Sequence, residues 1–351
     1  MQLYLQFPTN LQPLELYVEN KSYILWWNAK SEKEIAGFFM NNFPWEVMEE
    51  QSVQYETNFV SIRKLKKIDK DIFNKVRWIY YGSDNCEYLM PTKEEVAKAL
   101  DYYNIIRKRD SFEWSFVLNT PYLWEKMLNR AKEALLYLNE QNTKYKIEVV
   151  INDLWLLRFL EKECPNLHPI AWRLMHKLLK TPLVDTYWNK AHVAWKLISN
   201  QSSENIKKMQ EKIVEYQNKF YQSSEDSFWP FNNFLKRHKI ERTTLDFLEN
   251  RDTLYSNRDN LDLYYPYALV FTGRLCDTSA IENPERWNYA LNEVCNRTCH
   301  RYDLTYKIKT VWYNLLQKGN AWYRTETDLD KLDKTFLEKR NDNRLVFSPF
   351  I

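Results

Sequence analysis

Glycine is scarce in this sequence, with 4 residues among 351. Neither G-x-G-x-x-G nor G-x-x-x-x-G-K-[ST] occurs, which counts against a dinucleotide-binding or P-loop fold. The longest apolar stretches, such as 264–271, are far shorter than the ~20 residues needed to span a bilayer. The N-terminus is interrupted by polar residues and does not read as a secretory signal. We therefore expect a cytoplasmic protein with no membrane partner.

Neither sign of charge dominates, because 50 Lys and Arg face 47 Asp and Glu for a net charge of +3. This balance creates no global field that would require nucleic acid or an anionic surface as partner. RNA stays open as a partner through local basic runs such as 63–67. The 5 histidines show neither HExxH nor H-x-x-E-H spacing, and no G-x-S-x-G occurs, so the motifs predict no zinc protease or serine hydrolase.

Aromatic residues are abundant, with 14 Trp, 24 Tyr and 18 Phe. They supply either ordinary core packing or the lining of a substrate groove, since Tyr and Trp combine large apolar area with a polar group. The 5 cysteines are the other informative feature. In a reducing compartment, metal binding or redox chemistry is a better expectation for them than a disulfide framework.

Short β-branched or aromatic runs alternate with segments of helical periodicity. Strands are predicted at 76–81, 114–118, 146–151, 170–174, 242–247 and 261–265, and helices at 93–103, 122–139 and 154–163. This alternation is typical of a parallel sheet built from βα units. We predict an α/β fold, a TIM-barrel-like (β/α) barrel that is either incomplete or decorated with extra helices, one of them at 202–222.

The chain is expected to have three parts. Residues 1–74 form an N-terminal segment, which is either separate or supplies the first barrel strands. Residues 75–326 form the barrel-like core that carries the cysteines. Residues 327–351 are charge-rich and are expected to form a tail on the outside.

Four cysteines have positions suited to one metal site. Cys295 and Cys299 form a C-x3-C pair, while Cys86 and Cys276 each come just after a predicted strand. The carboxyl ends of parallel strands share one rim, where active sites are built. Four thiolates there suit a [4Fe–4S] cluster or a tetrahedral zinc ion. Cys164, after a predicted helix, is interpreted as a structural thiol.

Polar residues at predicted strand ends are candidates for substrate binding, and they are Asn152, Asp153, Arg173, Asp246 and Arg274. Either arginine could hold a substrate carboxylate through a bidentate fork. The alternative is helix capping for the first two and barrel ion pairs for the others. His300, beside Cys299, is either a further ligand or hydrogen-bond donor at the metal, or an ordinary histidine of the surface or core.

The chain resembles the collagenase-like U-32 peptidase family over residues 75–302. Residues 78–86 are similar to the family's early strand and first ligand cysteine. Residues 150–154 are similar to its V-x-N-D-x-G strand end, although Trp155 replaces the glycine. Residues 267–276, with Cys295 and Cys299, are similar to its cysteine cluster region, and 170–174 and 240–246 also fit. The interval from Cys276 to Cys295 is longer than in the quinone-pathway members, which indicates a distinct subfamily.

The resemblance implies a TIM-barrel-like scaffold with a [4Fe–4S] cluster on Cys86, Cys276, Cys295 and Cys299. The family includes proteins of oxygen-independent ubiquinone hydroxylation, which work in pairs, and enzymes that hydroxylate RNA bases. It therefore implies an oxygen-independent, hydroxylase-like enzyme acting on a small aromatic molecule, a peptide or an RNA base, with a paired family member as a potential heterodimer partner. The alternative is a non-catalytic scaffold or partner subunit whose cluster or zinc is structural. A peptidase activity follows from the family name alone, and no catalytic residue is assigned.

Overall fold

The structure is a computed structural model. It describes residues 2–7, 11, 76–110, 115–141, 146–173, 204–205, 207–208, 211–212, 215, 229–247, 260–265, 267–273, 276, 279, 295, 297–300, 304–307, 314–325 and 343–348. Arg274 and most of the helix predicted at 202–222 lie outside these residues, and the few described positions of that helix are helical.

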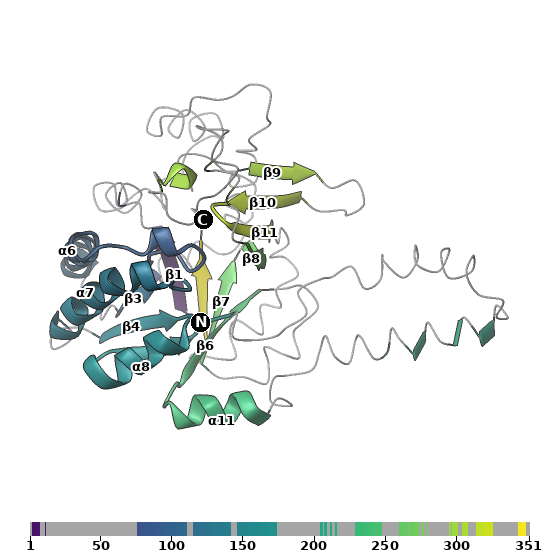
Figure 1. The fold of residues 1–351 in the computed structure, drawn as a ribbon, viewed down its shortest axis with the longest axis horizontal. Coiled ribbons are helices and arrows are strands. Elements are labelled where there is room, and N and C mark those ends of the chain that lie inside the picture. The colour runs from purple at the N-terminus through teal and green to yellow at the C-terminus, as the bar shows by residue number, and fades with distance from the viewer. Residues whose placement is uncertain are drawn as a thin grey trace, which may run out of the picture.

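Eight parallel strands close into a barrel (Figure 1). In order around the barrel they are β1 (Gln2–Phe7), β2 (Val76–Tyr81), β3 (Ser115–Asn119), β4 (Lys146–Ile151), β5 (His168–Ala171), β6 (Arg242–Asp246), β7 (Leu261–Tyr265) and β12 (Arg344–Phe347). Because β12 pairs with β1 in parallel register, the barrel has no open edge among these strands. The predicted TIM-barrel-like fold class is confirmed.

Helices cover the outside of the barrel. Between successive strands lie α6 (Lys93–Asp110), α7 (Glu125–Gln141) and α8 (Leu154–Glu163), which line up on one side in Figure 1, and α11 (Trp229–Arg237) precedes β6. The buried face of α7 carries Ala131, Ala134, Leu135 and Leu138, as its three- and four-residue spacing predicts. No helix in the described part of the chain is long and apolar enough to cross a membrane.

Side chains alternate across the barrel wall. Ile147 and Val149 of β4 pack in the cluster between strands and helices, whereas Val150 belongs to a second cluster with Tyr80, Val117, Tyr264 and Val346. This second cluster lies inside the barrel, because successive side chains of a strand point to opposite faces. The period-two pattern thus separates an outer apolar layer from an inner layer that also holds polar groups.

One inner layer is a buried ion-pair network. Arg344 donates to Glu148 at 2.7 and 3.2 Å, and Arg242 donates to Asp262 at 2.8 Å. Burial raises the pKa of Glu148, but the bidentate Arg344 outweighs it and holds that pKa below its ordinary value. Tyr80 closes the layer by donating its hydroxyl to Asp262. The charges of the two arginines neutralise those of the two acids, so we interpret this layer as structural.

A second sheet is inserted between β7 and β12. It is antiparallel, with the order β8 (Tyr267–Thr272), β11 (Ala321–Thr325), β10 (Asn314–Lys318) and β9 (Leu304–Lys307). Tyr267 and Tyr323 of this sheet pack against Trp172 and the interior of the barrel. Because β8 follows the carboxyl end of β7, the sheet lies over the end of the barrel toward which the strands point (Figure 1).

These elements decide two of our expectations about the ends of the chain. The segment 1–74 contributes the barrel strand β1. The segment 327–351, which we expected to lie outside as a tail, contributes β12 to the barrel wall. The small sheet was not predicted as a unit.

Candidate functional site: a thiol cluster above a buried polar network

The loop after β2 joins the two halves of the site. It begins at Gly82, whose φ of +105° and close approach to the Asn119 carbonyl oxygen leave no space for a side chain, since an added Cβ would stand 2.5 Å from that oxygen. Asp84, Asn85 and Cys86 follow, all buried. One tight turn therefore places a carboxylate and a thiol at the carboxyl end of the barrel.

Cys86 lies among the other three cysteines that the sequence pointed to. It packs with Leu89 and Cys299 in a small buried cluster. Its pKa lies well above the ordinary value, first because the thiol is buried, and then because Cys299, Cys276 and Cys295 repel a thiolate, while a backbone hydrogen bond at Tyr88 acts in the opposite direction.

Gly319, at the turn between β10 and β11, packs against two of these cysteines. A Cβ placed on it would lie 3.7 Å from Cys299 Sγ and 4.0 Å from Cys86 Cβ. In the C-x3-C loop, the Arg297 N–H donates to Cys295 Sγ at 3.3 Å. Segments far apart in the sequence thus bring Cys86 and Cys299 together, and Cys276 and Cys295 lie close enough for a negative charge on them to raise the pKa of Cys86. In the described part of the chain no group of three or more Cys, His, Asp or Glu side chains is arranged so that it could hold a metal ion.

Cys164 is separate from this group. It ends α8, its side chain is fully buried in the outer core, and burial together with Glu163 raises its pKa to about 11. His300 follows Cys299, and its Nε2 atom has no hydrogen-bond partner among the described residues. Burial, with Lys318 and Arg297 nearby, lowers the pKa of His300 to about 3, so the imidazole is neutral.

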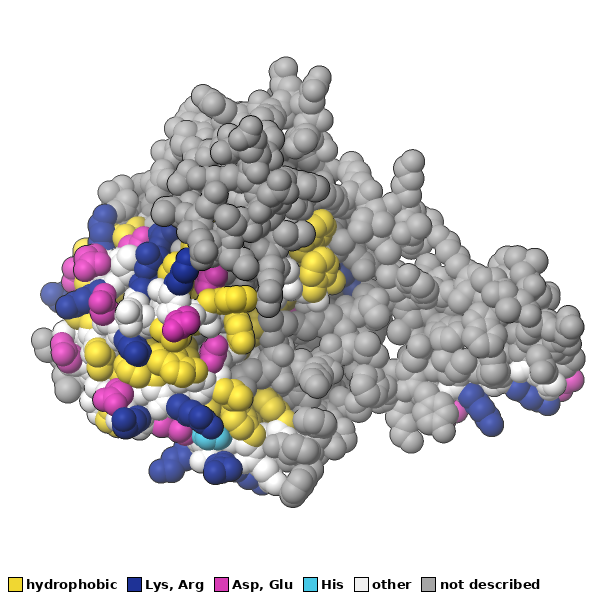
Figure 2. All heavy atoms as spheres, in the orientation of Figure 1, with side chains coloured by type: hydrophobic (Ala, Val, Ile, Leu, Met, Phe, Trp, Pro, Cys, Tyr) yellow, Lys and Arg dark blue, Asp and Glu magenta, His cyan; other side chains and the backbone are white. Residues whose placement is uncertain are grey.

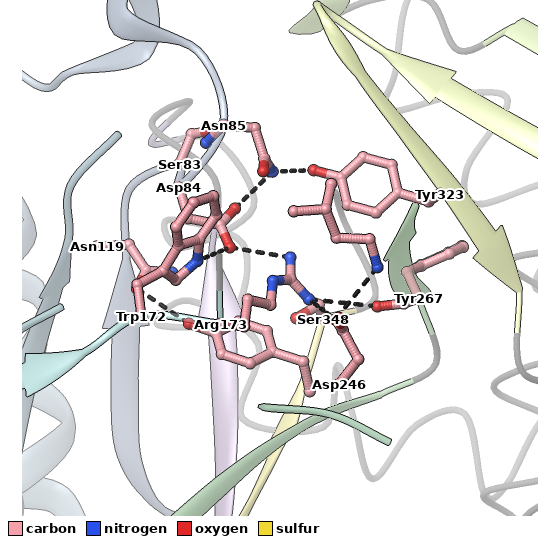
Figure 3. Close-up of polar contacts among 12 residues, drawn as sticks. Ser83, Asp84, Asn85, Asn119, Trp172, Arg173, Asp246, Tyr267, Tyr323 and Ser348 are labelled. Atoms are coloured by element: carbon pink, nitrogen blue, oxygen red, sulfur yellow. Dashed lines mark hydrogen bonds and ion pairs between the residues drawn. The ribbon is translucent and has the colours of Figure 1, made fainter. Parts of the chain in front are cut away.

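A buried polar network centred on Arg173 includes Asp84 and Asn85 of the loop that carries Cys86 (Figure 3). Its Nη2 atom donates to Asp84 Oδ2 at 2.9 Å, and its Nη1 atom donates to Asp246. The guanidinium also stands over the Tyr264 ring, 4.3 Å from its centroid. Asp84 further accepts from Trp172 Nε1 at 2.8 Å and from the Asn85 amide, which also donates to the Tyr323 hydroxyl.

The predicted substrate-binding residues therefore occupy different environments. Both Nη groups of Arg173 already bind carboxylates of the chain, so a substrate carboxylate would have to displace one of them. Asp246 also accepts from Leu269 N–H at 3.1 Å. Asp153 caps α8 by accepting from Trp155 N–H at 2.7 Å, the alternative role that the sequence left open.

Asn152 ties two loops to its own. Its amide donates to the carbonyl oxygens of Thr120 and Asp84, while its Oδ1 has no partner among the described residues. Asn119 Nδ2 is likewise without a partner there, although Asn119 Oδ1 accepts from the Tyr264 hydroxyl at 3.0 Å. These two amides offer one buried acceptor and one buried donor to a further polar group at the end of the barrel.

Sequence reasoning missed several members of the network: Asp84, Asn119, Trp172, Tyr264 and Tyr323. Asp84 carried a signal, since it lies two residues before Cys86 in the same loop. The tyrosines carried none, because nothing local distinguishes them among 24.

Comparison with known proteins adds no relative: no protein-family model, curated protein or solved structure matches this chain. The resemblance to the U-32 family stays a prediction.

Proposed function

We propose that this chain is an iron–sulfur enzyme that modifies its substrate without O₂, with Cys86, Cys276, Cys295 and Cys299 as ligands of one [4Fe–4S] cluster. The observation that carries the proposal is the buried thiol of Cys86, which packs with Cys299 and whose pKa is also raised by Cys276 and Cys295. Cysteine thiolates are the usual ligands of such clusters, which supply electron transfer.

The electrostatics of the site favour a cation. Without a metal, burial and mutual repulsion keep the Cys86 thiol protonated. A metal centre reverses this balance because its positive charge stabilises the thiolates, and binding releases their protons. Cys86 and Cys299 are buried while Cys276 and Cys295 are half-buried, so iron or zinc bound by these soft ligands would be partly shielded from water.

The substrate would lie at the same end of the barrel. Asp84 and Cys86 share one loop, so the polar network and the thiols are neighbours. The candidate substrates are a small aromatic molecule, a peptide or an RNA base. Figure 2 shows basic and acidic side chains interspersed over the described face of α6, α7 and α8, which does not favour a polyanion on that face. The proposal places the activity in the cytoplasm, where thiols stay reduced.

The proposed reaction replaces a C–H bond by C–OH. The oxygen atom comes from an oxygenated donor other than O₂, and that donor is reduced by two electrons while the carbon is oxidised by two. A redox centre beside the substrate would relay these electrons. The proposal assigns no catalytic residue; Arg274 remains a predicted substrate-binding residue, and Arg274→Ala is expected to abolish activity while leaving iron intact.

Metal analysis tests the first half of the proposal. Protein purified without oxygen should be brown, absorb broadly near ~400 nm and hold about four iron and four sulfide per chain. Serine at any one of the four cysteines should remove most of the iron, whereas Cys164→Ser, the matched control, should retain it. A colourless protein with one zinc per chain would refute the cluster and leave the scaffold function with a Cys₄ zinc site.

A mass comparison tests the second half. Metabolites, RNA and peptides from cells grown without oxygen, with the wild-type chain or the Cys86→Ser variant, should differ by one oxygen atom in one species. Co-purification from the same cells tests for a paired family member. If the wild-type protein holds iron but no species gains oxygen, the hydroxylase function fails and an electron-transfer role replaces it.

A further inference from the structure

Arg297, between the two cysteines of the C-x3-C loop, reaches across to the segment that carries Cys86. Its Nε atom donates to the Tyr88 carbonyl oxygen at 3.2 Å, and its Nη1 and Nη2 atoms donate to the two carboxylate oxygens of Glu95, the second at 3.3 Å. This is a bidentate pair between residues 202 positions apart. The Arg297 backbone, with φ of +54°, also directs its N–H to Cys295 Sγ.

Glu95 is itself held in place by the start of α6. Thr92 N–H donates to Glu95 Oε2 at 2.8 Å, and Glu95 N–H donates to Thr92 Oγ1 at 3.2 Å. This reciprocal pair is a capping box, so the Glu95 carboxylate has a defined position. Tyr88, the other partner of Arg297, packs against the small cluster of Cys86, Leu89 and Cys299. The guanidinium therefore joins one cysteine segment to the other through groups that are already fixed.

We infer that Arg297 and Glu95 form a positioning pair that holds the C-x3-C loop against the Cys86 loop and sets the charge beside the metal cluster. This inference rests on the proposed function, because it assigns a role to residues around the cluster. Arg297 contributes through both its side chain and its backbone N–H, and Glu95 contributes through Arg297 alone. Neither residue is proposed as a ligand.

The charges of Arg297 and Glu95 should change the reduction potential of the cluster, an effect that a purely structural role would not produce. Reduction adds an electron to a cluster that four thiolates already make anionic, so a nearby positive charge favours the reduced state and a negative charge disfavours it. Removing the Arg297 charge should lower the reduction potential. Removing the Glu95 charge should raise it, because Arg297 is then no longer neutralised. Both side chains are about one quarter exposed, so solvent screens the pair in part.

The experiment compares four variants of the full-length protein, each purified without oxygen. Arg297→Gln removes charge and fork, Arg297→Lys keeps charge but loses the fork, and Glu95→Gln removes charge while a glutamine still completes the capping box. Glu94→Gln is the control, because Glu94 lies in the same helical turn and its side chain is exposed. The readouts are the rate of iron release to a ferrous chelator and the cluster potential from a redox titration followed by electron paramagnetic resonance.

Arg297→Gln should release iron roughly 10- to 100-fold faster, the range typical of residues that support metal ligands. Arg297→Lys should also release iron faster but keep a potential near that of the wild type. Glu95→Gln should raise the potential, Arg297→Gln should lower it, and Glu94→Gln should match the wild type in both readouts.

Potential shifts of the same sign in Arg297→Gln and Glu95→Gln, or wild-type release rates in Arg297→Gln, would overturn the inference. The metal content of the wild-type protein reports separately on the proposed function. Zinc in place of iron would refute the cluster, and zinc release from the same variants would then decide whether the pair positions the cysteines. A wild-type protein without any metal would overturn both.

Discussion

Arg173→Met should destabilise the protein strongly, because it removes the only cation that the described structure places between Asp84 and Asp246. The side chain of Arg173 is 3% exposed, and its two carboxylate partners are 3% and 1% exposed. Burial lowers the pKa of Arg173, but the two carboxylates outweigh it and hold the pKa above its ordinary value, so the guanidinium stays charged. The substitution would leave two buried carboxylates without this counter-ion.

The expected loss follows from that geometry. Removing one partner of a buried ion pair costs about 3–5 kcal/mol, and the presence of two orphaned carboxylates places Arg173→Met near the upper end of about 5 kcal/mol. Asp84→Asn should cost less, about 1–3 kcal/mol, because the Arg173–Asp246 pair stays balanced while charged hydrogen bonds are lost. For a chain of this size the first loss corresponds to a fall in Tm on the order of 10 °C.

Thermal and urea unfolding followed by circular dichroism measure these differences. The triple variant, with Asp84→Asn and Asp246→Asn added to Arg173→Met, should recover part of the stability lost in the single variant, because no unpaired charge remains. In Arg173→Met the unpaired carboxylates acquire raised pKa values, so its deficit should shrink as pH falls from 8 to 5 and they take up protons. A loss below about 1 kcal/mol, or a triple variant less stable than Arg173→Met, would refute the reasoning.

Three further predictions concern other parts of the fold. Cys164, with its pKa at about 11, should react with iodoacetamide at pH 8 on the order of 100-fold more slowly than an ordinary exposed thiol, as mass spectrometry of the metal-free protein would show. Gly82→Ala should lower the free energy of unfolding by more than about 2 kcal/mol, whereas Gly319→Ala should lower it by about 1 kcal/mol, because Gly319 has a φ of +60° but an added Cβ there would meet no atom closer than 3.7 Å. Equal losses in the two variants would contradict this steric argument. Because the pKa of Glu148 is lowered in the folded protein, its carboxylate stabilises the fold at pH values above its unfolded pKa of about 4.3, and this stabilisation is lost as pH falls through the folded pKa. Glu148→Gln should therefore make the free energy of unfolding depend less steeply on pH on the acid side.

Local pattern was enough for the elements whose signal lies within a few residues. The ranges predicted for β2, β4, β7 and α8 agree with the structure, because short β-branched or aromatic runs and helical periodicity are both read along the chain. β12 was missed for the opposite reason. Its Arg344 points into the barrel and resembles the charged residues around it in the sequence until Glu148, 196 positions away, is seen to pair with it.

The candidate site divides in the same way. The sequence by itself singled out Cys86, Cys276, Cys295 and Cys299 and excluded Cys164, because strand ends and the C-x3-C spacing are local. Only the tertiary structure decided that the guanidinium of Arg173 pairs with Asp84 and Asp246, and that Arg297 pairs with Glu95. A charged side chain takes its role from its partner, and here that partner comes from another strand or helix, which no spacing along the chain specifies.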